Sequence, residues 1–131
     1  MSNAKSSEAS RPVLSFGAAE KRIAEQFELT WLISNRPERS EVYRELTRII
    51  ADVYCHGWSR PVVVDGEEVT FGYLQELYKH LTAEHVDYVL DRLERYPREI
   101  NHKKAFIRTA LVNSIFEMQT ETENLYARSR A

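Results

Sequence analysis

The sequence has few of the residues on which disulfide-rich and membrane proteins depend. Its 131 residues include one cysteine, Cys55, so no disulfide can form within the chain and a reducing compartment is expected. No apolar run approaches the roughly 20 residues that a membrane-spanning helix needs. The N-terminus also has no hydrophobic stretch of the kind that marks a signal peptide. These absences predict a cytoplasmic protein that does not associate with a membrane.

Glycine, proline and net charge are also low. The sequence has only four glycines and four prolines, which argues against a loop-rich all-β fold. The 18 Lys and Arg residues nearly balance the 20 Asp and Glu residues, for a formal net charge of −2. Such a protein is not expected to coat nucleic acid, although a local basic face stays open. The length indicates one domain that folds without disulfides or metal.

The apolar periodicity predicts a mainly α fold, a bundle of about five helices with a short two-stranded β-hairpin. The expected helix starts are Ala18, a first turn at Pro37, and three N-capping residues, Thr70, Thr82 and Asn101. The core is expected to contain Ile23, Phe27, Leu46, Ile50, Val53, Leu74, Leu77, Val86, Val89, Leu90, Leu93, Phe106, Ala110 and Leu111.

A β-hairpin is expected between the second and third helices. The β-branched run Pro61–Val64 is followed by Asp65-Gly66 and then by Glu67–Thr70. The Asp-Gly dipeptide favours a type I′ turn, because both central residues of that turn need a positive φ. An isolated hairpin is marginally stable, so one face is expected to pack on the helices.

The chain divides into three parts by composition. Residues 1–17 are polar and small and are predicted to form a disordered leader; Ser2-Asn3-Ala4 resembles a cloning scar, which hints at a piece of a longer protein. Residues 18–118 form the predicted helical domain. Residues 119–131 form a polar tail with Leu125 and Tyr126 as isolated anchors, either a short extra helix or a frayed end.

No set of residues with catalytic or metal-binding spacing is present. The four glycines are scattered, so no phosphate-binding loop is expected, and no two histidines have the i, i+4 spacing of a zinc helix. Cys55 is interpreted as a small residue that ends a helix rather than as an activated thiol. The pairs Glu67-Glu68 and Asp87-Asp91 are expected to be solvated charges. We therefore expect no cofactor and no enzymatic activity, with an enzyme of unknown class as an alternative.

One basic segment is a candidate contact surface. Between residues 92 and 108, six basic residues face two acidic ones, Glu94 and Glu99, which leaves an excess of four positive charges. Gathered on one surface, they would attract anions and give salt-dependent, sequence-independent contact with DNA, or contact with a protein partner. The alternative is an ordinary solvated helix face. Trp31, Trp58, Tyr73 and Tyr88 are interpreted as core aromatics, with a recognition surface as the alternative. The candidate contact residues are Arg92, Arg95, Arg98, Lys103, Lys104 and Arg108.

Two segments carry a resemblance to a known family. The segment 84–91 reads EHVDYVLD, and the segment 100–113 reads INHKKAFIRTALVN; Cys55 and the run Val62–Glu67 precede both. This order resembles the helical C-terminal domain of RepA-type plasmid replication initiators, which is similar to DnaD-like primosome modules. The resemblance covers about residues 27–118. The chain departs from the family pattern at His102, which replaces an apolar residue, and over residues 114–118.

The resemblance implies a function in recruiting a partner. In the family, an N-terminal winged helix binds the plasmid origin, and the C-terminal domain engages a host replication protein, primase or helicase loader. The expected function is therefore a non-catalytic interaction domain of a plasmid or mobile-element replication initiator. Accessory DNA binding through the basic segment is the alternative, and the two can coexist. The first helix can instead mediate self-association. No individual contact residue carries over from the family.

Overall fold

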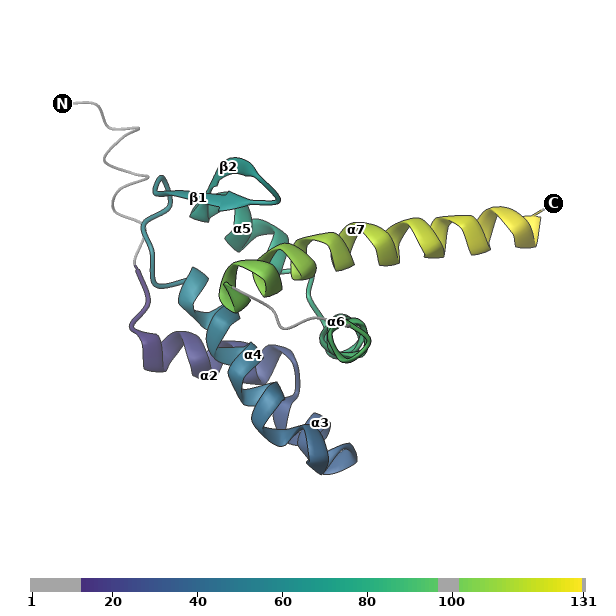
Figure 1. Cartoon of the computed structure of the whole chain (residues 1–131), viewed down its shortest axis with the longest axis horizontal. Helices are drawn as coiled ribbons and strands as arrows, with labels where there is room; N and C mark the ends of the chain where they lie inside the picture. Colours follow the sequence, from purple (N-terminus) through teal and green to yellow (C-terminus); the bar gives the residue numbers. More distant parts are fainter. Residues whose placement is uncertain (1–12, 97–101, 131) are drawn as a thin grey trace.

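The computed structural model describes residues 13–96 and 102–130, which form six α-helices, one 3-10 turn and one antiparallel hairpin. Figure 1 shows their arrangement. Among the helices described, none combines the length and the apolar character needed to cross a membrane. The elements in chain order are α2 (Phe16–Gln26), α3 (Leu29–Asn35), η1 (Pro37–Arg39), α4 (Ser40–Val53), β1 (Pro61–Val64), β2 (Glu67–Thr70), α5 (Phe71–Tyr78), α6 (Ala83–Glu94) and α7 (Lys103–Arg130).

The mainly helical class with a two-stranded hairpin is confirmed, and α4 lies at the centre of the packing. It contacts α2, α3, α5 and α7, and its residues Tyr43, Leu46, Ile50 and Val53 are buried along one face. This spacing of three and four residues is that of an amphipathic helix. Most of the expected core is buried. Four expected core residues are only half-buried: Leu77, Leu93, Phe106 and Ala110.

The single helix expected after Ala18 is instead two helices, α2 and α3. Glu28 adopts a left-handed conformation with φ 52° and separates them. The turn brings Leu32 into the core, whereas Trp31 is 58% exposed, so the interpretation of Trp31 as a core residue is wrong. Tyr73 on α5 is likewise exposed. No glycine or proline marks the break at Glu28, which is why the periodicity alone did not reveal it.

The hairpin has the expected turn. Asp65 and Gly66 both have positive φ, 54° and 78°, and Val64 pairs with Glu67 across the turn. Val62 and Val64 are buried while Val63 is exposed, which is the alternation of a strand with one face on the core. The strand β1 packs against α7.

Two of the three predicted caps are confirmed. The Thr70 hydroxyl accepts a hydrogen bond from the Tyr73 N–H at 3.1 Å. Thr82 precedes α6, and its N–H donates to His85 Nδ1 at 3.1 Å. Asn101 lies outside the described residues. The helix α7 begins two residues after it, and the His102 carbonyl accepts from the Phe106 N–H.

The helices begin and end at different residues from those expected at both ends of the helical part. The first described helix begins at Phe16, capped by Ser15, whereas residues 1–12 of the predicted leader lie outside the described part. At the other end α7 continues to Arg130, so the predicted tail is neither a separate helix nor a frayed end. In Figure 1 the C-terminal half of α7 extends away from the other helices. Residues 103–130 contain no glycine or proline, and a helix nucleated on the core propagates at low cost.

Candidate functional site

The helices α6 and α7 pack against each other and leave a groove along their contact. Its volume is about 610 Å³. On α7 the lining residues recur every three or four positions, so they occupy one face of the helix. The residues that line the groove are Tyr88, Val89, Arg92, Leu93, Arg95 and Tyr96 on the α6 side, and Phe106, Thr109, Ala110, Asn113 and Glu117 on α7.

The floor of the groove is apolar. Val89 is buried, and Leu93, Phe106 and Ala110 are half-buried because one side of each faces the groove rather than the core. Near one end, the rings of Tyr96 and Phe106 meet edge to face with their centroids 5.1 Å apart. This geometry is favourable for aromatic pairs. It presents two rings from the two walls at the same end of the groove.

A polar network links the two walls at the other end. The Tyr88 hydroxyl donates to Glu117 Oε2 at 2.6 Å, and Arg92 donates to the Tyr88 oxygen at 3.2 Å. Arg92 also forms an ion pair with Glu117. The hydrogen bond to Glu117, followed by burial, raises the pKa of the Tyr88 hydroxyl. The network therefore keeps the phenol protonated and holds α6 and α7 at a fixed separation.

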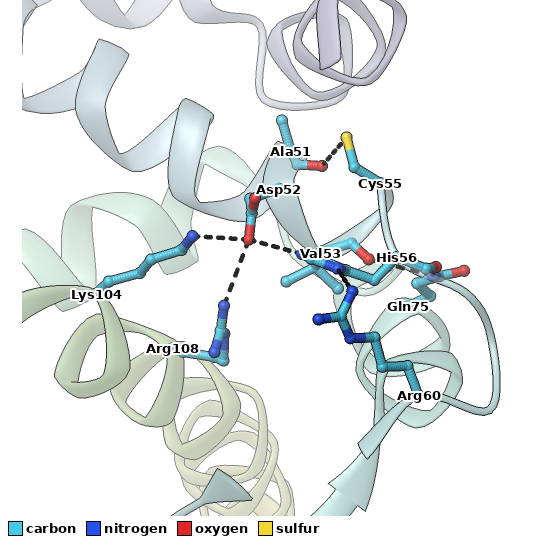
Figure 2. Close-up of polar contacts among 9 residues, drawn as sticks. All are labelled: Ala51, Asp52, Val53, Cys55, His56, Arg60, Gln75, Lys104 and Arg108. Atoms are coloured by element: carbon cyan, nitrogen blue, oxygen red, sulfur yellow. Dashed lines mark hydrogen bonds and ion pairs between the residues drawn. The ribbon is translucent and has the colours of Figure 1, made fainter. Parts of the chain in front are cut away.

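Three of the candidate contact residues, Lys103, Lys104 and Arg108, lie on the α4 side of α7. Lys103 Nζ is 2.9 Å from Glu45 Oε1. Lys104 Nζ is 2.8 Å from Asp52 Oδ2, and the Arg108 guanidinium is 3.6 Å from the same oxygen. Figure 2 shows Lys104 and Arg108 converging on Asp52. These three cations connect α7 to α4.

Asp52 is the centre of a wider polar cluster at the C-terminal end of α4. His56 Nε2 lies 3.3 Å from the same Asp52 oxygen, and the His56 ring stacks on Phe71 with centroids 4.2 Å apart. Burial alone would raise the pKa of Asp52, but the hydrogen bond and charge of Lys104, followed by those of His56, hold it below the usual value. Gln75 of α5 donates to the Val53 and His56 carbonyls, both at 3.2 Å, and so satisfies two acceptors at the end of α4. The cluster, drawn in Figure 2, joins α4, α5 and α7.

The described candidate contact residues therefore lie in two separate places in the structure. Arg92 and Arg95 lie at the groove, whereas Lys103, Lys104 and Arg108 face carboxylates of α4. Arg98 lies outside the described residues. The five that are described do not share one face, and four of them form ion pairs within the chain. This arrangement leaves less positive charge for DNA than a count along the sequence implies.

The carboxylates expected to be solvated on α6 have a structural role. Arg39, at the end of η1, is buried and donates to Asp91 Oδ1 at 2.6 Å and to Asp87 Oδ1 at 3.3 Å. It also lies 3.0 Å from Glu94 Oε1, and the Tyr43 hydroxyl donates to Asp87 at 2.6 Å. These contacts anchor α6, one wall of the groove, to the start of α4. Glu67 and Glu68, by contrast, are exposed as expected.

The described residues contain no group of three or more His, Cys, Asp and Glu side chains that could hold a metal ion. Cys55 is half-buried and its thiol donates to the Ala51 carbonyl at 3.6 Å. Burial, with a smaller contribution from the charge of Asp52, raises the pKa of the Cys55 thiol. A raised pKa disfavours the reactive thiolate, which fits the interpretation of Cys55 as a residue that ends a helix.

Comparison of the chain with protein-family models, with curated proteins and with solved structures returned no match.

Proposed function

We propose that this chain is a non-catalytic interaction domain of a plasmid or mobile-element replication initiator, and that it recruits a host replication protein such as primase or helicase loader. The observation that carries the proposal is the groove between α6 and α7. Residues 84–91 and 102–113, the described parts of the two segments that resemble the initiator family, supply six of its eleven lining residues.

The make-up of the groove suits a protein contact. An apolar floor with a polar rim is the anatomy of protein interfaces. Leu93, Phe106 and Ala110 supply the floor, whereas Arg92, Asn113 and other polar residues stand at the exposed rim. The volume of about 610 Å³ falls in the usual range for binding pockets, about 300–1,000 Å³. It can take several side chains of a partner.

The polar groups of the groove support binding rather than catalysis. General acid–base chemistry needs a group whose pKa lies near the working pH. Tyr88, Arg92 and Glu117 instead satisfy one another, and the pKa of Tyr88 is raised further from neutrality. Among the described lining residues there is no cysteine, serine or histidine that could pair as nucleophile and base.

A direct binding measurement tests the proposal. The full chain is immobilised, and purified primase and helicase loader from the same cell are passed over it separately. We expect saturable binding of one of the two. Binding of neither protein by the folded chain, with its helix content verified by circular dichroism, would contradict the proposal.

A further inference from the structure

We propose that the groove receives an amphipathic α-helix of the recruited protein, with apolar side chains on the floor and a carboxylate beside Arg95. This inference rests on the proposed function and specifies the partner's docking element. It depends on the secondary structure of the walls, the length of the groove and the distribution of charge along its rim.

The walls of the groove determine the mode of recognition. Both are formed largely by helices, α6 and α7, whose main-chain groups are used in their own hydrogen bonds. A partner strand would therefore find no free sheet edge there. A helix needs none, since it binds through side chains alone.

The dimensions of the groove suit a short helix. The α7 lining extends from Phe106 to Glu117, which corresponds to about 16 Å along a helix axis. Three turns of a docked helix span that length. A third helix can pack in the groove between two adjacent helices, with its axis about 8–10 Å from each of theirs. Apolar residues at i, i+3 or i+4, and i+7 of the partner would then face Leu93, Phe106 and Ala110.

The charges along the rim determine which charge the docked helix should carry. Arg92 is already paired with Glu117. Arg95 is exposed and forms no ion pair with any residue in the described ranges 13–96 and 102–130, although its charge contributes to lowering the pKa of Asp91. Among the described residues of the rim, Arg95 is therefore the cation without an ion pair, near the Tyr96–Phe106 end. A carboxylate on the docked helix complements it, and an exposed charge pair of this kind confers specificity more than affinity.

The same charges disfavour a nucleic acid strand. Binding of single-stranded nucleic acid combines stacking rings with a run of cations that follows the phosphates. The groove has rings at Tyr96 and Phe106, but the carboxylate of Glu117 lies on its lining and neutralises Arg92. Within the part of the chain that the structure describes, the lining supplies Arg95 as its one arginine outside an ion pair, which is a poor match for a phosphate backbone.

A peptide selection tests the inference. The probe is a phage-displayed library of 16-residue peptides, selected on the full chain and counter-selected on the variant Ala110→Trp, whose indole would fill the groove. We expect enriched peptides with apolar residues at helical spacing and at least one Asp or Glu. The absence of enrichment, or enriched peptides without acidic residues, would overturn the inference.

A charge swap then tests the contact with Arg95. An enriched peptide is labelled with fluorescein and titrated with wild type and with Arg95→Glu, an exposed substitution that leaves the core intact. We expect the dissociation constant to rise about tenfold, because the reversal removes the charge pair and places two like charges together, and a peptide with Lys in place of its acid to recover it. The control Arg44→Glu, an exposed reversal on α4, should leave binding unchanged. Equal binding to wild type and Arg95→Glu, or displacement of the peptide by oligothymidine, would contradict the inference.

The replication proteins themselves separate this inference from the proposed function. If primase or helicase loader binds wild type and both groove variants equally, the groove is not the docking site and the proposed function stands. If neither protein binds while the selected peptides do, the groove accepts an acidic helix and the proposed function is wrong. Weaker binding of one of these proteins by Arg95→Glu and Ala110→Trp, with Arg44→Glu unaffected, supports both.

Discussion

Arg39 provides a quantitative test of how α6 is held in place. Its side chain is 4% exposed and contacts three carboxylates of α6, whose side chains are 33%, 48% and 63% exposed for Asp87, Asp91 and Glu94. The contact is therefore asymmetric: the cation is buried, and the anions are partly solvated. Its two sides should respond differently to substitution.

This asymmetry determines how much unfolding free energy each substitution should cost. Replacing Asp87 and Asp91 by Asn and Glu94 by Gln leaves a buried guanidinium without a counter-charge, and should cost about 3–5 kcal/mol of unfolding free energy. Arg39→Met leaves the three carboxylates able to regain water, and its side chain keeps most of the packing of the arginine stem. We therefore expect Arg39→Met to cost only about 1–2 kcal/mol, a charged hydrogen bond discounted for solvent exposure.

Urea denaturation followed by circular dichroism measures these costs in four proteins: wild type, Arg39→Met, the triple carboxylate variant and the combination. In the Arg39→Met background, the triple change should cost less than about 1 kcal/mol, because the buried charge it would strand is gone. Equal costs for Arg39→Met and the triple variant, or costs that simply add in the combination, would refute the reasoning. The first result would mean that the guanidinium is solvated, and the second that the contacts are not coupled.

Two further predictions concern the core and the Asp52 cluster. Leu90→Ala removes a buried side chain of α6 and should cost about 2–5 kcal/mol; an unchanged thermal unfolding midpoint would show that the site is not part of the core. The second is Asp52→Asn, which should destabilise the protein at neutral pH but much less in acid. Because the pKa of Asp52 is lowered on folding, the unfolded state binds more protons. The carboxylate's contribution is therefore complete above about pH 4 and is lost as pH falls through the folded value. Urea denaturation at about pH 7 and about pH 3 measures it, and an equal deficit at both would contradict the sign.

Features set by a few neighbouring residues could be predicted from the sequence. Asp65-Gly66 specified the hairpin turn through its backbone preferences, and Thr70 specified a cap through its own hydroxyl. The break at Glu28 could not be found in this way. A left-handed glutamate has no local advantage, so its conformation is imposed by the burial of Leu32 and Phe27 on either side.

The candidate site was less accessible to sequence reasoning, because charge along a chain says nothing about which charges meet. Lys103 and Lys104 are neutralised by Glu45 and Asp52, residues more than fifty positions away. Asp87 and Asp91 likewise form ion pairs with Arg39, which is far from them in the sequence. The free positive charge of the described residues in 92–108 is therefore smaller than the composition of this segment implies. The groove itself depends on the packing of α6 against α7, which periodicity does not specify. Tyr88, interpreted from the sequence as a core aromatic, is half-buried on the groove wall.

The placement of the basic residues assigns them a different role in the proposed function. The first half of α7 carries two sets of contacts: Lys104 and Arg108 bind Asp52 on the α4 side, while Phe106 and Ala110 line the groove. A helix is stiff over this length, so a change in the ion pairs would also displace the groove wall. Lys104 and Arg108 would then support partner binding by positioning α7 rather than by contacting the partner. Substitution of Lys104 and Arg108 should weaken partner binding even though the side chains that line the groove are unchanged. Substitution of basic residues on a solvated helix face would have no such effect.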